Sequence, residues 1–229
     1  MSEVFRRSAR SRGRDRRRSL TKETAAGAVG EITKGCEIFG LSKGQFSLID
    51  LIEHCLDATG PADVIISTWS AAAADIEYAN RLITDGRIRS LRFLVDFSFP
   101  SRKPEYCDLL RSVFGDDCVR MAQTHAKFVV IKNDDWTLAL RTSMNLNHNR
   151  RLESFEVSDD PGMVEYLEGV IDEVFAGDTL AAQLKRGRGQ DETTLNAIGI
   201  SESGWFGSGE LDRDIRRAGW STLKGERLK

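Results

Sequence analysis

The stretch that decides the fold of this chain is 124–156, THAKFVVIKNDDWTLALRTSMNLNHNRRLESFE. Two apolar runs within it are separated by the turn-forming residues NDD at 133–135. We therefore predict strands over 119–131 and 137–144 that pair as an antiparallel hairpin, followed by a short strand over 152–158. This hairpin would bring the polar residues at its open end together at one edge of a sheet.

Five polar residues of this stretch suit a phosphate-binding site. Because side chains alternate along a strand, His125 and Lys127 should share one face, and Ser143 and Asn145 one face of the next strand. Together they offer a nucleophile or proton donor and three groups that bind phosphate oxygens. Glu156 could accept the ring proton of His125 and fix its tautomer. Each residue alone is better explained as a surface or turn residue, but their combination favours the phosphate site.

Helices and strands alternate on the N-terminal side of this stretch. Apolar periodicity, caps and breakers predict helices over 45–59, 70–85 with Ser70 as N-cap, 104–115 and 161–177, and buried strands over 63–69 and 88–97. This order is typical of βαβ units. We therefore predict an α/β protein with a mixed, largely parallel β-sheet and helices on both faces.

Composition divides the chain into four segments. Residues 1–20 form an arginine-rich arm that we predict to be disordered, and 21–44 a glycine-rich connector with a short ordered piece near 36–41. The α/β domain covers 45–177. A flexible linker and a short C-terminal segment fill 178–229. This last segment, from Trp205 to Trp220, either docks on a protein partner or packs on the chain's own domain.

The N-terminal arm carries a concentrated positive charge on a chain whose net charge is -2. Arginine is well suited to contact phosphate, so we expect the arm to bind nucleic acid, most readily DNA, without sequence preference. The alternatives are a solubilising tail and, with less support, a transit peptide. The arginines concerned are Arg6, Arg7, Arg10, Arg12, Arg14, Arg16, Arg17 and Arg18.

Composition also argues against several classes of protein. No apolar run is long enough to cross a bilayer, and the N-terminus has no apolar signal region, so we expect a cytoplasmic protein that does not insert in a membrane. The four cysteines form no CxxC pair, which argues against a structural zinc site or a disulfide framework. We expect them to be reduced and mostly buried.

The central stretch resembles the signature of the phospholipase D superfamily, which is H-x-K-x4-D, then G-S-x-N, then a glutamate. The matching pieces are HAK at 125–127, TSMN at 142–145 and Glu156. The resemblance covers about 45–176 and neither tail. Two positions depart from the signature: Lys132 stands where the aspartate is expected, and Thr142 replaces the glycine.

The resemblance implies a mechanism without a metal or other cofactor. His125 would attack phosphorus and form a phosphohistidine, while Lys127, Ser143 and Asn145 stabilise the charged oxygens. A second histidine must protonate the leaving oxygen, and members with one H-x-K motif obtain it by forming two-fold dimers. The resemblance thus implies a homodimer with one composite site. We expect His148 to be a rim residue and not that second histidine.

These observations lead to three hypotheses. The first is a metal-independent nuclease of the phospholipase D type that acts on nucleic acid. The second is a protein of the same fold that binds or assembles on DNA and has lost turnover, which Lys132 and Thr142 favour. The third, with least support, is a phospholipase, because no amphipathic membrane-binding helix is apparent.

Overall fold

The structure is a computed structural model that describes residues 15–20, 22–148 and 150–176. Five arginines of the arm, from Arg6 to Arg14, and the segment from Trp205 to Trp220 lie outside these residues. Contacts divide the chain into two units, 1–170 and 171–229, and the sheet belongs to the first. Among the described residues, no helix combines the length and apolar character needed to cross a membrane.

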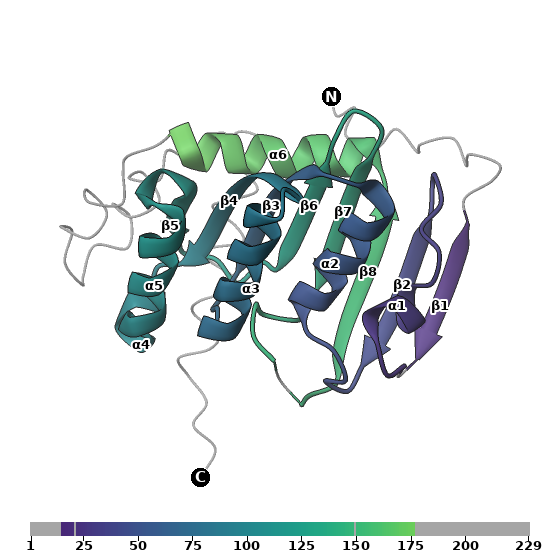
Figure 1. Cartoon of the computed structure of the whole chain (residues 1–229), viewed down its shortest axis with the longest axis horizontal. Helices are drawn as coiled ribbons and strands as arrows, with labels where there is room; N and C mark the ends of the chain where they lie inside the picture. Colours follow the sequence, from purple (N-terminus) through teal and green to yellow (C-terminus); the bar gives the residue numbers. More distant parts are fainter. Residues whose placement is uncertain (1–14, 21, 149, 177–229) are drawn as a thin grey trace, which may run out of the picture. The chain divides into compact units, whose positions relative to one another are not determined.

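The described residues form one sheet of eight strands in the order β1-β2-β8-β7-β6-β3-β4-β5 (Figure 1). Their bounds are β1 Arg16–Leu20, β2 Glu37–Ser42, β3 Ala62–Thr68, β4 Ile88–Asp96, β5 Val119–Ala122, β6 Phe128–Lys132, β7 Thr137–Thr142 and β8 Glu153–Asp159. A mixed α/β sheet is therefore confirmed. The expected hairpin is present as the antiparallel pair β6–β7.

The sheet is less parallel than the helix–strand alternation suggested. Among the described strands, β1–β2, β3–β4 and β4–β5 are parallel, whereas β2–β8, β8–β7, β7–β6 and β6–β3 are antiparallel. The reason is that β6, β7 and β8 follow one another through short connections, which join antiparallel neighbours. Parallel pairing is confined to the strands that a helical crossover connects.

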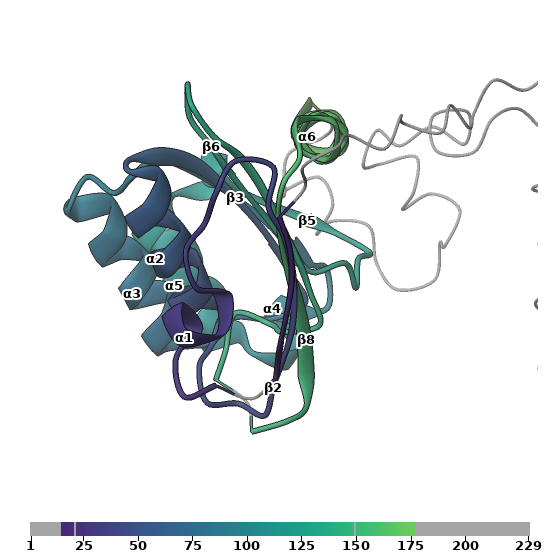
Figure 2. The same cartoon turned by 90° about the vertical axis from the view of Figure 1, so that its right-hand side faces the viewer.

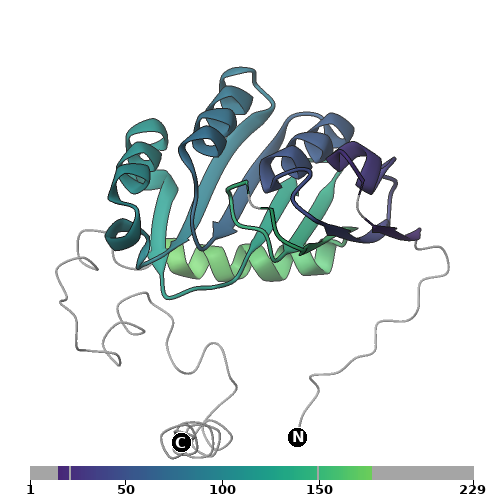
Figure 3. The same cartoon turned by 90° about the horizontal axis from the view of Figure 1, so that it is seen from below.

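Helices α2, α3 and α5 lie along one face of the sheet, and the part of α6 before residue 171 lies on the other (Figures 2 and 3). The helices are α1 Ala25–Val29, α2 Leu48–Thr59, α3 Ala73–Thr84, α4 Phe99–Arg102, α5 Pro104–Phe114 and α6 Pro161–Ala176, and a 3-10 turn covers Asp116–Cys118. Helix α2 shows why these segments are helical. Its Ser47 backbone N–H donates to Asp50 Oδ2 at 2.7 Å, its apolar face is buried, and Gly60, with φ 72°, ends it.

The domain begins earlier than the sequence indicated. Residues 16–20, assigned to the disordered arm, form β1, and the predicted connector contains α1 and β2. Burial could not reveal β1, because alternate residues of this edge strand are exposed. It is held instead by backbone pairing with β2 and by Arg17, whose Nη1 donates to Val29 O at 3.0 Å. The predicted ordered piece near 36–41 corresponds to β2.

The predicted strand over 119–131 is two strands, β5 and β6, joined by a loop at 123–127. The break is required by topology, because β5 pairs with β4 whereas β6 pairs with β3 on the other side of the β3–β4 pair. The chain must therefore cross the ends of β4 and β3 between them. His125 and Lys127 lie in this crossing loop and not on a strand.

The segment before α3 also differs from the expectation. Ser70 is not an N-cap, because α3 begins at Ala73. The residues in between are extended and pair with the segment after β7, where Ala72 N donates to Leu146 O at 2.9 Å. Leu146 N in turn donates to Thr68 Oγ1 at 3.1 Å. These bonds fix the polar segment after β7 against the end of β3.

Three of the four cysteines are buried, as the sequence predicted. All four lie in the described residues as free thiols, and Cys36, Cys55 and Cys107 are buried. Burial raises the pKa of each of these three thiols, which keeps them protonated near neutral pH.

Candidate functional site

Strand directions bring several polar loops to one edge of the sheet. Strands β3, β4 and β7 end at this edge, and the antiparallel β6 and β8 begin there. We call it the carboxyl edge, after the ends of the parallel strands. In α/β sheets, ligands commonly bind outside such strand ends. The four residues predicted to meet there, His125, Lys127, Ser143 and Asn145, all lie in its loops.

His125 and Lys127 are direct neighbours, although not through the alternation of a strand. Lys127 Nζ lies 3.2 and 3.3 Å from the two ring nitrogens of His125 and donates to the His125 carbonyl at 2.9 Å. The loop is fixed on both sides, because Ser67 Oγ donates to Ala126 O at 2.9 Å and Thr142 N donates to Lys127 O at 3.1 Å. The His125 side chain is exposed, so an incoming ligand can reach it.

The ammonium of Lys127 is tuned by its surroundings. Burial lowers its pKa, and the carboxylates of Glu153 and Asp96 oppose this shift. A partly buried ammonium has lost some of its hydration, and a bound anion replaces the lost interactions with a charge-assisted hydrogen bond. Lys127, beside the imidazole of His125, is therefore suited to bind an anion.

Glu153 is the carboxylate that the sequence interpretation missed. It is the first residue of β8, and it accepts a hydrogen bond from Ser143 Oγ. Ser143 Oγ also accepts from Ser154 N at 2.9 Å. Glu153 thus binds the hydroxyl of the predicted Ser143 and also acts electrostatically on the ammonium of Lys127. Its position at the start of the strand after the S-x-N segment was the available signal.

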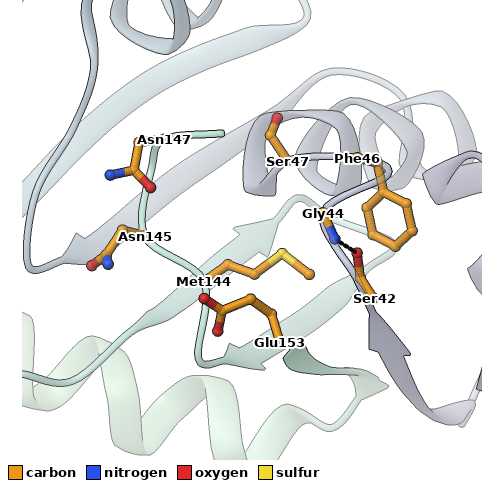
Figure 4. A pocket seen from close by; sticks show the side chains of 8 residues that line it. All are labelled: Ser42, Gly44, Phe46, Ser47, Met144, Asn145, Asn147 and Glu153. Atoms are coloured by element: carbon orange, nitrogen blue, oxygen red, sulfur yellow. Dashed lines mark hydrogen bonds between the residues drawn. The ribbon is translucent and has the colours of Figure 1, made fainter. Parts of the chain in front are cut away.

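Asn145 lies beside a small pocket at the same edge (Figure 4). Its Oδ1 is buried and has no hydrogen-bond partner among the described residues. A buried amide oxygen without a partner is costly in a folded protein and is often completed by water or a ligand. Figure 4 shows the residues that line the pocket, which are Ser42, Gly44, Phe46, Ser47, Met144, Asn145, Asn147 and Glu153.

Glu156 is not brought to His125. Side chains alternate along β8, and the ring of Phe155 contacts Phe46, which precedes α2, with centroids 5.7 Å apart. Glu156 therefore faces the opposite side of the sheet, where it accepts a hydrogen bond from Arg141. Strand alternation, which motif spacing ignores, separates this carboxylate from the imidazole.

The two departures from the signature have structural roles. Lys132 lies at the turn end of β6, where its Nζ donates to Glu168 Oε2 at 2.6 Å. Thr142 ends β7, and its hydroxyl donates to Ser154 O at 2.8 Å and accepts from Met144 N at 3.0 Å. Lys132 thus lies away from the carboxyl edge, and Thr142 shapes the turn that leads to Ser143.

The remaining predicted residues are His148 and the arginines of β1. His148 is exposed in the segment after β7. Arg16, Arg17 and Arg18 lie on the edge strand β1, where Arg16 Nε donates to Glu37 Oε2 at 3.2 Å and Arg18 is exposed. Among the described residues, no group of three or more histidine, cysteine, aspartate or glutamate side chains is arranged to hold a metal ion.

Comparisons with known proteins give little further information. No protein-family profile and no curated protein matches the chain. Among solved structures, a polyphosphate kinase from Porphyromonas gingivalis aligns with a TM-score of 0.43 and 10% identity. The alignment covers 59% of this chain and 25% of that protein. The assignment of the site therefore depends on its own residues.

Proposed function

We propose that this protein is a metal-independent phosphodiesterase that cleaves nucleic acid with His125 as nucleophile. The observation that supports this proposal best is the contact between His125 and Lys127 at the carboxyl edge, where Ser143 and Asn145 also lie. The group comprises a nucleophilic imidazole, a cation for the phosphate and two further polar groups for its oxygens.

The reaction requires two steps. In the first, a ring nitrogen of His125 attacks phosphorus, a P–N bond forms, and the P–O bond to the leaving alcohol breaks as that oxygen accepts a proton. In the second, water attacks phosphorus and gives a proton to the group that protonated the leaving oxygen, the P–N bond to His125 breaks, and a phosphate monoester leaves. Lys127 stabilises the negative oxygens in both steps.

The proton donor in this proposal is the partner subunit's His125. In-line displacement needs attacking and leaving groups on opposite sides of phosphorus, and one H-x-K motif supplies one side. Two large apolar side chains at the same edge support a partner copy there: Phe97, after β4, is 52% exposed and Leu152, before β8, is 65% exposed. A two-fold dimer would cover such side chains.

Nucleic acid is the proposed substrate because of the arginine-rich N-terminus. Arg16 and Arg18 continue this basic sequence into β1, where both side chains are exposed. Such a segment adds phosphate contacts that weaken as salt rises.

A second candidate is a nucleic-acid-binding protein of the same fold without turnover. It is favoured by the pairing of Glu156 with Arg141, which leaves the His125 ring without a carboxylate partner among the described residues. In that case the site binds phosphate and does not cleave it.

Plasmid nicking in excess EDTA separates the two functions. We expect the wild type to nick, His125→Ala to fall to background, and Gln123→Ala, an exposed residue of the same loop, to retain activity. Quenching with a labelled substrate should trap an acid-labile phosphohistidine that His125→Ala cannot form.

Equal nicking by wild type and His125→Ala would contradict the proposal. Salt-sensitive retention of DNA without nicking, lost when residues 1–14 are removed and β1 is left in place, would establish the binding protein instead. A monomer in light scattering at working concentration would remove the composite site, and Leu152→Glu should produce such a monomer from the wild-type dimer.

A further inference from the structure

The carboxylate that the sequence predicted to orient the ring of His125 does not reach it. The side chain is exposed, it lies in a loop, and Glu156 is on the other face of the sheet. A nucleophile must nevertheless be held in a narrow range of orientations, because small misplacements lower rates strongly. Besides Lys127, the ring contact that the described residues give His125 is Trp69, with centroids 5.8 Å apart and planes at 61°.

Trp69 follows β3 and is itself firmly held. The guanidinium of Arg102 lies over its ring, with Cζ 3.6 Å from the centroid. Arg102 Nη2 also donates to the backbone carbonyl of Trp69 at 2.9 Å. This combination of cation–π stacking and a hydrogen bond fixes both the ring and the backbone of one residue.

Arg102 is held in turn by the end of β4. Its Nε donates to Ser98 Oγ at 2.9 Å, and its Nη2 lies 3.8 Å from Asp96 Oδ1. Asp96 Oδ1 accepts from Ser98 N at 3.0 Å and also from the Ser98 hydroxyl. The guanidinium is thus oriented by a carboxylate and a hydroxyl that are already ordered.

The second carboxylate oxygen of Asp96 binds the loop that carries His125. Asp96 Oδ2 accepts from the backbone N–H of Thr124 at 3.2 Å, one residue before His125. Thr124 Oγ1 accepts from Ala126 N at 3.1 Å, which tightens the turn around His125. Asp96 is 6% exposed, and a carboxylate that deep in a protein requires such partners.

We propose that Trp69, clamped by Arg102 and Asp96, is the positioning residue for the imidazole of His125. Trp69 restricts the ring from one side, and Asp96 fixes both the clamp and the loop that carries the ring. The network takes the place of the carboxylate that the motif led us to expect. The effect of Trp69 on the reaction rate rests on the proposed function. The effect of Trp69 on the orientation of the His125 ring rests on geometry alone.

The geometric arm of the test is NMR of the histidine ring protons. The chain has three histidines, and His125→Gln assigns the signals of His125. Trp69→Leu removes the indole ring current, so the His125 signals should shift while those of His54, whose Nε2 lies 2.8 Å from Gly30 O, stay in place. Trp69→Phe keeps an aromatic ring and should shift them less.

The same NMR signals of His125 test the clamp on Trp69. Arg102→Gln should broaden or shift them, whereas Arg111→Gln, which breaks an exposed pair with Asp116, should not.

The kinetic arm uses nicking. Trp69→Leu and Arg102→Gln should lower kcat by roughly 10- to 100-fold with KM little changed, because the ring is misplaced and not removed. Trp69→Phe should restore most of kcat. If Trp69→Leu leaves the His125 signals unchanged, the inference is overturned, whatever the activity. If the signals shift in a protein that never nicks, the positioning stands and the proposed function fails.

Discussion

The two ends of the β6–β7 hairpin carry similar residues but use them differently. At the turn end, Asn133 Oδ1 accepts from Trp136 N at 2.8 Å, and its Nδ2 donates to Thr59 O at 2.9 Å. Lys132 is paired with Glu168. At the carboxyl edge, Lys127 contacts a histidine instead of an acid, and Asn145 Oδ1 has no partner among the described residues. The turn end satisfies these polar groups internally, whereas, within the described part of the chain, the carboxyl edge leaves the Lys127 ammonium without an acidic hydrogen-bond partner and Asn145 Oδ1 available to a ligand.

The two lysines of the hairpin provide the sharpest test of this difference. Lys127→Ala should lower nicking on the order of 100- to 1000-fold, because it removes the cation that stabilises the phosphate oxygens. Lys132→Ala should leave nicking unchanged and lower the free energy of unfolding by about 0.5 kcal/mol, since the ion pair is partly exposed. Equal losses of activity in both variants would erase the distinction between the two ends.

Asn133 tests the structural end. Asn133→Ala removes its bonds to Thr59 O and Pro61 O and those it accepts from Asp135 N and Trp136 N. We expect the free energy of unfolding to fall by about 2 kcal/mol, because the turn loses bonds at several backbone groups. Urea unfolding measures it, and nicking per folded molecule should stay at the wild-type value. A large loss of activity in folded protein would show that the turn end also serves the site.

Glu153 and Glu156 both lie on β8 but on opposite faces of the sheet, so their variants allow a matched comparison of their effects on Lys127. Because the Glu153 carboxylate opposes the lowering of the Lys127 pKa, Glu153→Gln should lower that pKa further. Glu156→Gln should leave it unchanged, since Glu156 lies on the other face with Arg141. NMR titration of the lysine ε-methylene signals measures both. A shift in the Glu156 variant instead would place the wrong carboxylate at the site.

The pH dependence of stability gives the smallest effect. Burial lowers the pKa of Lys127, so between that value and the ordinary lysine value of about 10.4 the unfolded state binds more protons than the native state. Stability should therefore rise with pH through this alkaline window, while below it the cost of burying the ammonium is fully present. Lys127→Met should remove this rise, and Lys132→Met should retain it, in urea unfolding at a series of pH values. A rise of equal size in Lys127→Met would assign it to other groups.

Most of the sheet and the polar cluster could be predicted, because they depend on local patterns. Apolar runs located β3, β4, β7 and β8, and turn formers located the hairpin. Residues predicted to meet at one edge do lie there, since strand directions follow from the hairpin. The arginine-rich edge strand β1 was missed, because backbone pairing with β2 holds it without an apolar pattern.

The sequence by itself determined the α/β class and the hairpin. It also determined that His125, Lys127, Ser143 and Asn145 lie at one edge of the sheet, because each of these features depends on residue type and short spacing. The tertiary structure alone decided which other residues accompany them. In the folded protein, Glu156 lies on the opposite face of the sheet from Phe155, Glu153 bonds Ser143, and the ring of Trp69 contacts the ring of His125. The physical reason is that strand order and strand phase, which separate or unite residues distant in sequence, are set by how the whole sheet packs.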